Sequence, residues 1–196
     1  MKTAGIVLAA GASQRMGQAK ALLRGVEGGV LAVRQAARLR AGGCRPVAVV
    51  LGARAEEVRR ELPENLAQVE NPRWAQGRAT SLQAAIRAFP RADGFLFLPV
   101  DAVGVREATV RALLAAARKA PQVIWRPVYR GAKGNLLWIP PAAARDLLDL
   151  AADARVDEWA RPRAHELEVD DPAVLRNINT PEEWAAMAAQ TGGAEA

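Results

Sequence analysis

Residues 4–20 read AGIVLAAGASQRMGQAK, and the rest of the chain can be interpreted outward from this segment. Its first five residues form a short apolar run, and the remainder is rich in small residues and contains Gly11 and Gly17. An apolar run that leads into glycine-containing sequence is typical of a buried strand followed by a ligand-binding loop. We therefore predict a strand over 4–8 and a functional loop that ends near Lys20.

The loop after this strand has the chemistry of a phosphate site. Small side chains let backbone N–H groups approach a ligand closely, and consecutive N–H groups can form a concave anion site. Arg15 can bind phosphate oxygens through its planar guanidinium, and Lys20 supplies a compact positive charge. The sequence predicts a polyphosphate-binding loop, and the alternative is a flexible connection in which Arg15 and Lys20 occur by chance.

Two widespread phosphate-binding motifs do not match this loop. The GxxxxGK[ST] pattern fails because Gly17 is not followed by lysine and Lys20 is not followed by serine or threonine. The GxGxxG pattern fails because Gly11 has no second glycine two residues later. The sequence therefore indicates neither a P-loop ATPase nor a dinucleotide-dependent dehydrogenase.

Strands and helices alternate along the first hundred residues. Two further apolar runs, 45–51 and 94–98, read as strands, and helical spacing is present over 30–41, 55–62 and 80–88. Strands buried on both faces and separated by helices indicate a mostly parallel sheet that is covered on each side. We therefore predict an α/β protein with a three-layer α/β/α architecture.

After residue 100 the alternation of strands and helices becomes less regular. We expect helices and strands to continue, the helices over 105–120, 142–150 and 181–189 and the strands over 123–128, 136–139 and 166–169. The first two of these strands are expected to form a hairpin-like insertion after the parallel core. A length of 196 residues suits one domain, which we place at 1–190, with 191–196 as a disordered tail.

Composition excludes several classes of protein. The chain is 51% hydrophobic and 24% charged, which is enough apolar material for a buried core. It has no apolar run near the ~20 residues of a membrane span and no signal-peptide pattern, so we expect a cytoplasmic protein without a membrane partner. Because Cys44 and His165 are the only residues of their types, an internal disulfide and a Cys- or His-based zinc site are excluded. Any metal must be held by oxygen.

The net charge of +6 and the pI of 10.4 favour anionic partners. Only four of the 27 basic residues are lysines, so a coding bias toward arginine and a solvated basic surface are one explanation of the charge. The aromatic residues do not cluster with arginine into stacking platforms. Nucleic acid is therefore not the partner that the sequence predicts.

The segment 8–20 resembles the signature loop of the nucleotidyltransferases of molybdenum-cofactor maturation, a group of cytidylyltransferases and guanylyltransferases. The pattern LAAGxSxRMGxxK is matched at each defined position. Three later segments are also similar to the group, namely NPRWAQG at 71–77, LPVD at 98–101 and NINTPEEW at 177–184. The resemblance implies the Rossmann-like nucleotidyltransferase fold, which is also called the nucleotide-diphospho-sugar transferase fold, with a mostly parallel sheet.

The resemblance also implies particular functional residues. Lys20, Arg15 and Asp101 are implied as catalytic, and Asp101 and Asn179 as ligands of Mg²⁺. The implied nucleotide-binding residues are Leu8, Ala9, Ala10, Gly11, Ser13, Arg15, Gly17, Lys20, Gly77 and Ser81. Gly134 and Asn135 are implied on the acceptor side.

Residue patterns support some of these roles and leave alternatives for others. Asp101 follows the apolar run 94–98, and open α/β sheets bind their ligands at the carboxyl ends of strands. Mg²⁺ takes oxygen ligands and often only one or two from protein. The alternatives are that Asp101 belongs to a turn or caps the next helix, that Asn179 belongs to a helix start capped by Thr180, and that Thr80 or Ser81 is a helix cap.

The reaction implied by the resemblance is attack of a substrate phosphate on the α-phosphate of a nucleoside triphosphate, with release of pyrophosphate. The implied acceptor is of the molybdopterin type, and molybdoenzymes or their chaperones are implied as further partners. Loop residues 8–11 and the segment 71–77 favour CTP, whereas 177–182 resembles the guanylyl branch and favours GTP. We expect CTP because the first loop lies nearest the base.

The chain departs from the group on the acceptor side. It reads Asp-Ala-Val at 101–103 instead of a proline-containing motif, Gly-Asn-Leu at 134–136 instead of Gly-His-Pro, and lacks the usual glycines at 152–155. Triphosphate binding is therefore indicated more strongly than the acceptor. The alternatives are a sugar-phosphate or alcohol-phosphate nucleotidyltransferase and a non-catalytic nucleotide-binding protein.

Overall fold

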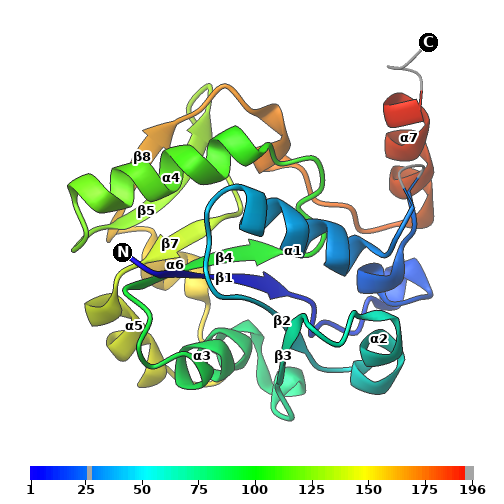
Figure 1. Ribbon diagram of the computed structural model, residues 1–196, viewed down its shortest axis with the longest axis horizontal. Helices are drawn as coiled ribbons and strands as arrows, with labels where there is room; N and C mark the ends of the chain where they lie inside the picture. The colour runs from blue at the N-terminus through cyan, green and yellow to red at the C-terminus, as the bar shows by residue number, and fades with distance from the viewer. Residues whose placement is uncertain (26–27, 193–196) are drawn as a thin grey trace.

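The structure is a computed structural model that describes residues 1–25 and 28–192. An eight-stranded sheet runs through its centre in the order β3-β2-β1-β4-β7-β5-β6, with β8 paired to β5 (Figure 1). The strands are β1 (Thr3–Leu8), β2 (Val47–Leu51), β3 (Ala67–Glu70), β4 (Gly94–Pro99), β5 (Ile124–Tyr129), β6 (Ala132–Lys133), β7 (Leu137–Ile139) and β8 (Ala164–Glu168).

Helices cover both faces of the sheet, as Figure 1 shows for α1 and α4 on one side and α3 and α5 on the other. The α-helices are α1 (Leu31–Ala41), α2 (Ala55–Glu61), α3 (Arg78–Ala88), α4 (Glu107–Lys119), α5 (Pro141–Leu148), α6 (Val156–Ala160) and α7 (Pro181–Gly192). The 3₁₀ helices are η1 (Gln14–Met16), η2 (Lys20–Leu22), η3 (Trp74–Gln76) and η4 (Pro172–Leu175). The predicted three-layer α/β/α architecture is confirmed.

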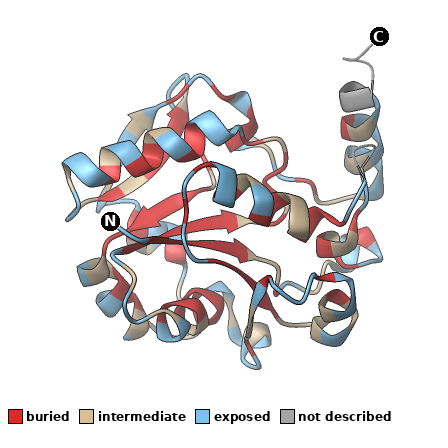
Figure 2. Cartoon of the chain, in the orientation of Figure 1, coloured by how far each residue is buried: buried red, intermediate tan, exposed pale blue. Residues whose placement is uncertain are grey.

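Successive side chains of the central strands point to opposite faces of the sheet and so contribute to two apolar layers. In β1, Val7 packs into the layer with α1 and α4, while Ile6 packs into the layer with α3 and α5. Val49 and Val50 of β2 divide in the same way. Both faces of these strands are therefore buried, as Figure 2 shows, and this is why their sequences are continuous apolar runs.

The predicted mostly parallel sheet is confirmed, and the predicted hairpin-like arrangement is present as the antiparallel strands β5, β6 and β7. β1 pairs in parallel with β2 and β4, β2 with β3, and β5 with β8. β7 is antiparallel to both β4 and β5, so the expected insertion is part of the same sheet. The two strands pair at a single position, Trp125 with Trp138, and the chain between them forms the short strand β6. Local sequence indicated these strands and their antiparallel connection, but not the pairing of β7 with β4.

Besides β6 and the 3₁₀ helices, two elements have no counterpart in the sequence predictions. The edge strand β3 contains only four residues, none of them fully buried, and α6 contains only five residues. Such short elements leave little periodicity to detect. The last helix begins at Pro181 as predicted and extends to Gly192, and residues 193–196 of the predicted tail lie outside the described residues.

The topology brings the loops that follow β1 and β4 to one edge of the sheet. Leu8 and Pro99, the last residues of these neighbouring parallel strands, are paired in register. The segment that precedes α7 reaches the same edge, because the Ile178 N–H donates to the Asp101 carbonyl at 3.0 Å. Over the part of the chain that the structure describes, no helix is long and apolar enough to cross a membrane.

Candidate active site

The loop after β1 is folded back on itself and anchored to the protein interior. Met16 is buried in the apolar layer beneath α1 and fixes the middle of the loop. Ser13 has a left-handed backbone conformation with φ of 52°, and its Oγ accepts a hydrogen bond from the Lys20 N–H at 3.2 Å. Gly17 also has a positive φ, 72°, where a side chain would be strained. These contacts hold Arg15 and Lys20 on the same loop at the sheet edge.

Lys20 is the centre of a polar cluster. Its Nζ donates to Asp101 Oδ2 at 2.7 Å and to Asn179 Oδ1 at 2.9 Å. Arg15 also donates to Asn179 Oδ1, through Nη2 at 3.2 Å. The Lys20 and Asp101 side chains are only 13% and 23% exposed, so solvent screens this ion pair less than a surface pair. The structure thus brings together four residues that the sequence analysis singled out from three distant segments.

A buried amide fixes the backbone on both sides of Asp101. Gln35 of α1 has no exposed surface, and its Nε2 donates to the Val100 carbonyl at 3.0 Å and to the Ala102 carbonyl at 2.9 Å. Both carbonyls would otherwise face the protein interior without a partner, which is unfavourable. Gln35 therefore sets the direction in which the Asp101 carboxylate leaves the end of β4.

A capping box fixes the segment that contains Asn179. Glu183 Oε2 accepts hydrogen bonds from the backbone N–H groups of Asn179 at 2.5 Å and Thr180 at 3.2 Å. In return, the Glu183 N–H donates to Thr180 Oγ1 at 3.3 Å. The predicted helix start at Thr180 and Pro181 is therefore present, and it positions the Asn179 side chain toward Lys20.

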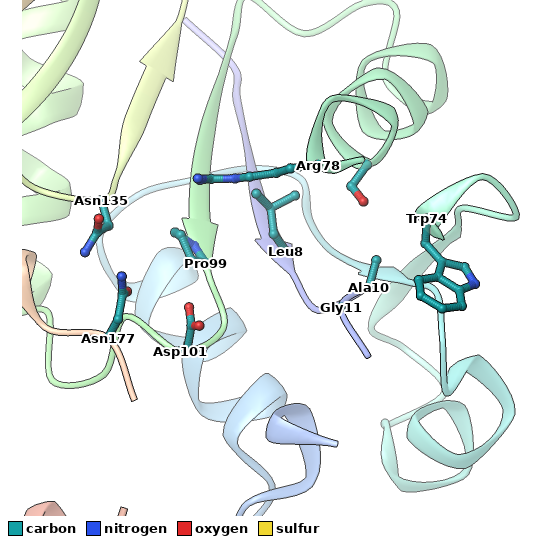
Figure 3. Close-up of a pocket in the computed structure, with 10 residues that line it drawn as sticks. Leu8, Ala10, Gly11, Trp74, Arg78, Pro99, Asp101, Asn135 and Asn177 are labelled. Atoms are coloured by element: carbon teal, nitrogen blue, oxygen red, sulfur yellow. The ribbon is translucent and has the colours of Figure 1, made fainter. Parts of the chain in front are cut away.

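A cleft of about 330 Å³ opens over the ends of β1 and β4. Its lining residues, most of which are labelled in Figure 3, are Leu8, Ala10, Gly11, Trp74, Arg78, Ser81, Pro99, Asp101, Asn135 and Asn177. A hollow of about 120 Å³ shares Gly11 and Asp101 with this cleft and also includes Lys20. A third hollow, of about 470 Å³, is lined by Arg15, Lys20, Asn179 and the rest of the loop tip. Asp101 lines the first two spaces and Lys20 lines the second and third, so all three lie around the polar cluster.

Most of the predicted site residues line these three hollows. Those that do are Leu8, Ala9, Ala10, Gly11, Ser13, Arg15, Lys20, Ser81, Asp101, Asn135 and Asn179. Gly17, Gly77 and Gly134 do not line them. A Cβ at Gly77 would lie 2.3 Å from the Ala152 carbonyl oxygen, and one at Gly134 would lie 2.9 Å from the Pro127 carbonyl oxygen. These two glycines permit close backbone packing behind the site.

Two alternative interpretations of the sequence are wrong. Asp101 does not cap α4, because the N–H of Arg106, the residue before the helix, donates to Asp171 Oδ2 at 2.8 Å. Neither Thr80 nor Ser81 caps α3, because that helix begins at Arg78. Instead, Ser81 Oγ accepts a hydrogen bond from Asn71 Nδ2 at 2.9 Å inside the protein.

The cleft has three polar or aromatic lining residues that were not predicted as site residues, Trp74, Arg78 and Asn177. Trp74 packs partly buried at one end of the cleft. Arg78 follows the predicted Gly77, and Asn177 lies two residues before the predicted Asn179. The sequence analysis therefore singled out their neighbours but assigned no role to these two side chains. Proximity to a motif glycine or asparagine was the available signal.

The oxygen atoms around Lys20 suit a divalent cation. Asp101 Oδ2 and Asn179 Oδ1 both contact the Lys20 ammonium, so the two oxygens converge on a point that already holds a positive charge. A carboxylate and an amide oxygen are acceptable ligands for Mg²⁺. Among the described residues, no three His, Cys, Asp or Glu side chains are grouped to hold a metal. A divalent ion here would therefore take its remaining ligands from water and substrate phosphates, as Mg²⁺ commonly does.

The protein is thus an α/β/α protein with a basic, glycine-containing loop at the carboxyl edge of its sheet, which is where open α/β sheets bind their ligands. Residues 5–169 match the family model described as MobA-like NTP transferase domain. The chain belongs to this family of nucleotidyltransferase domains, and the family resemblance of the sequence is confirmed.

Three curated relatives differ in how much of each chain aligns. The bifunctional IPC transferase and DIPP synthase of Rubrobacter xylanophilus is 39% identical over 132 residues, which are 63% of this chain and 29% of the relative. Nicotine blue oxidoreductase of Paenarthrobacter nicotinovorans is 35% identical over 115 residues, 58% of this chain and 56% of the relative. The probable molybdenum cofactor guanylyltransferase of Rhodopirellula baltica is 28% identical over 185 residues, 90% and 87% of the two chains. The chain thus spans less than two thirds of the length of the first two relatives.

Solved structures share the fold over nearly the whole chain. The crystal structure of Rv0371c from Mycobacterium tuberculosis H37Rv aligns with a TM-score of 0.81 at 25% identity and covers 96% of this chain and 99% of that one. A manganese complex of Rv0371c aligns with a TM-score of 0.75 at 22% identity and the same coverage. The predicted nucleotidyltransferase fold is therefore confirmed.

Proposed function

We propose that this protein is a metal-dependent nucleotidyltransferase that transfers CMP from CTP to a phosphate group of a molybdopterin-type acceptor. An oxygen of the acceptor phosphate bonds to the α-phosphorus of CTP, the bond from that phosphorus to the α,β-bridging oxygen breaks, and pyrophosphate leaves. The observation that carries the proposal is the contact of Lys20 Nζ with both Asp101 and Asn179 beside a loop that suits a triphosphate.

Catalysis by these residues consists of alignment and charge neutralisation. The acceptor phosphate is already an anion, so no side chain has to remove a proton from it. Loop N–H groups and Arg15 hold the β- and γ-phosphates, and Lys20 turns from Asp101 to the α,β-bridging oxygen, where negative charge develops. This account needs no catalytic histidine or cysteine, in agreement with the composition of the site.

Mg²⁺ is the proposed metal, with Asp101 and Asn179 as its protein ligands. When bound, the ion neutralises triphosphate charge and polarises the α-phosphate. The binding of a manganese ion by Rv0371c, as its structure describes, supports a divalent ion in this fold. Lys20 Nζ contacts both of these oxygens, so when Lys20 turns toward the triphosphate, Asp101 and Asn179 would be available to hold the ion.

The proposal also specifies the base of the nucleotide and the chemical class of the acceptor. CTP is supported by the resemblance of 8–11 and 71–77 to the cytidylyl branch. GTP is the second candidate, because 177–182 resembles the guanylyl branch and one relative is named a guanylyltransferase. A sugar-phosphate or alcohol-phosphate acceptor is supported by the altered motifs at 101–103 and 134–136.

Thermal unfolding with each nucleotide tests the proposed function. The protein is heated with CTP, GTP, ATP or UTP, each with and without Mg²⁺, and a ligand at about 100 times its Kd adds about 2.7 kcal/mol of stability. We expect a Mg²⁺-dependent rise in Tm with CTP that is lost in Lys20→Met and Asp101→Asn. A rise with GTP alone would change the base, and no rise with any nucleotide would contradict the transferase proposal.

A further inference from the structure

We propose that Arg78 binds the phosphate group of the acceptor and favours a phosphomonoester at this position. This inference rests on the proposed transfer reaction and specifies where its second substrate is held. Arg78 lines the main cleft, although neither the loop after β1 nor the Lys20 cluster includes it. The inference depends on where the Arg78 side chain points, on how far its positive charge is compensated, and on the hydrogen-bond donors beside it.

Arg78 reaches into the half of the cleft that is distant from Trp74. Figure 3 shows Trp74 and Ala10 at one end of the cleft and Asn135 and Asn177 at the other. The Arg78 side chain leaves the start of α3 and extends over Leu8 and Pro99, with its guanidinium toward the Asn135 side (Figure 3). A nucleoside has the Trp74 half available, which leaves the Arg78 half for the acceptor.

The positive charge of Arg78 is only partly compensated. Arg78 Nη1 lies 3.5 Å from Asp157 Oδ2, and the two side chains are 40% and 54% exposed. Arg126 of β5 donates to the other oxygen of the same carboxylate at 2.8 Å, and its side chain is only 8% exposed. One carboxylate therefore serves two guanidinium groups, and the pair of arginines keeps a net positive charge at this wall of the cleft.

Asp157 is committed to the buried arginine rather than to Arg78. Nε of Arg126 is buried and has no hydrogen-bond partner among the described residues, so the bond to Asp157 is its main compensation for burial. The contact of Arg78 with Asp157 is longer, and solvent screens it. Arg78 can therefore exchange this contact for a dianionic ligand in the cleft at little cost.

The other polar groups at this end suit a phosphate as well. Asn135 and Asn177 offer amide N–H donors, and Asp101 is the one carboxylate among the described residues that line the cleft. A planar guanidinium can donate two parallel hydrogen bonds to phosphate oxygens, and neighbouring amide N–H groups can donate to the same phosphate from another side. Because Asp101 lines the same cleft, a phosphate at Arg78 lies next to the position proposed for the α-phosphate.

The test uses methyl phosphate, the smallest phosphomonoester, as the probe. The full chain is titrated by NMR with methyl phosphate, both alone and saturated with Mg²⁺ and a CTP analogue whose α,β-bridge is a methylene group and cannot break. Dimethyl phosphate is the control ligand, because it has one negative charge and no terminal phosphate. We expect the wild-type protein to bind methyl phosphate at least tenfold more tightly than dimethyl phosphate.

The variants separate a phosphate-binding arginine from a merely structural one. Arg78→Met is expected to weaken methyl phosphate binding at least tenfold, Arg78→Lys less, and both are expected to keep the Kd of the CTP analogue within twofold. Arg87→Met is the matched control, since Arg87 is an exposed arginine near the other end of α3, and it should change neither affinity. Asp157→Asn removes the competing carboxylate and should tighten methyl phosphate binding about threefold.

The outcomes distinguish this inference from the proposed function. If Arg78→Met weakens the CTP analogue and leaves methyl phosphate unchanged, Arg78 belongs to the nucleotide and the inference is overturned. Equal binding of both phosphate esters by the wild-type protein would overturn it too. If the analogue does not bind at all, the transferase proposal fails, while the titration without analogue still shows whether Arg78 holds a phosphomonoester.

Discussion

At the scale of single residues, the candidate site depends on side chains that never touch a substrate. Asp101 and Lys20 supply the charges, but the buried amide of Gln35 holds the backbone carbonyls on both sides of Asp101. Gln83 of α3 is buried in the same way and donates to three carbonyls at the end of α5. The two glutamines have the same chemistry, and only one of them lies behind the site.

Replacement of Gln35 with leucine should damage the site more than the fold. Gln35→Leu leaves the Val100 and Ala102 carbonyls without a partner, and each unsatisfied buried group costs about 1–3 kcal/mol. We expect a comparable loss of unfolding free energy in Gln83→Leu, measured by urea unfolding. Affinity for Mn²⁺ with CTP, measured by electron paramagnetic resonance, should fall about tenfold in Gln35→Leu alone. Equal affinities in the two variants would show that Gln35 does not position Asp101.

At the scale of elements, α7 acts on the site through its first turn. Asn179 precedes the helix, and the Glu183 carboxylate holds its backbone N–H. α7 also packs into the layer beneath α1 through Met187 and stands beside the loop after β1 (Figure 1). The helix is thus a support that holds Asn179 against Lys20 and Arg15.

Loss of the capping box should therefore weaken metal binding. Glu183→Ala removes the acceptor for the Asn179 and Thr180 N–H groups and should cost about 0.5–2 kcal/mol of unfolding free energy. Because Asn179 loses its fixed backbone, we expect the Kd for Mn²⁺ with CTP to rise at least threefold. Glu183→Gln is the matched control, since glutamine also serves in a capping box. An unchanged Kd in Glu183→Ala would show that Asn179 is positioned by other contacts.

The elements also show what the sequence could predict. β1, β2 and β4 were predictable because burial on both faces makes their sequences continuously apolar, whereas the edge strand β3 is half exposed and has no such run. Lys20, Asp101 and Asn179 were predictable because each lies in a motif that resembles the family, and the structure brings the three side chains together. The pairing of Arg78 with Asp157 was not predictable, because it depends on how α6 packs against the start of α3.

At the scale of the whole molecule, the sheet is enclosed by two buried apolar layers. Cys44 lies in the layer beneath α1 with no exposed surface, and a Cβ at Gly5 of β1 would lie 2.7 Å from the Cys44 Cβ. The thiol is therefore packed directly on the central strand. The pKa of this thiol therefore reports whether the layer excludes water in solution.

Burial raises the pKa of the Cys44 thiol from its ordinary value of 9.0 to about 12, and the nearby Arg45 opposes this only in part. Above pH 9 the unfolded chain releases a proton that the folded protein retains, so the unfolding free energy falls by about 1.4 kcal/mol per pH unit up to the folded pKa. Cys44→Ala lacks this proton, so its unfolding free energy should fall less steeply than that of the wild-type protein between pH 9 and 11. Urea unfolding at pH 8, 9.5 and 10.5 measures the two slopes. Parallel slopes would mean that water reaches Cys44 and that the layer opens beside β1, the strand from which the phosphate-binding loop begins.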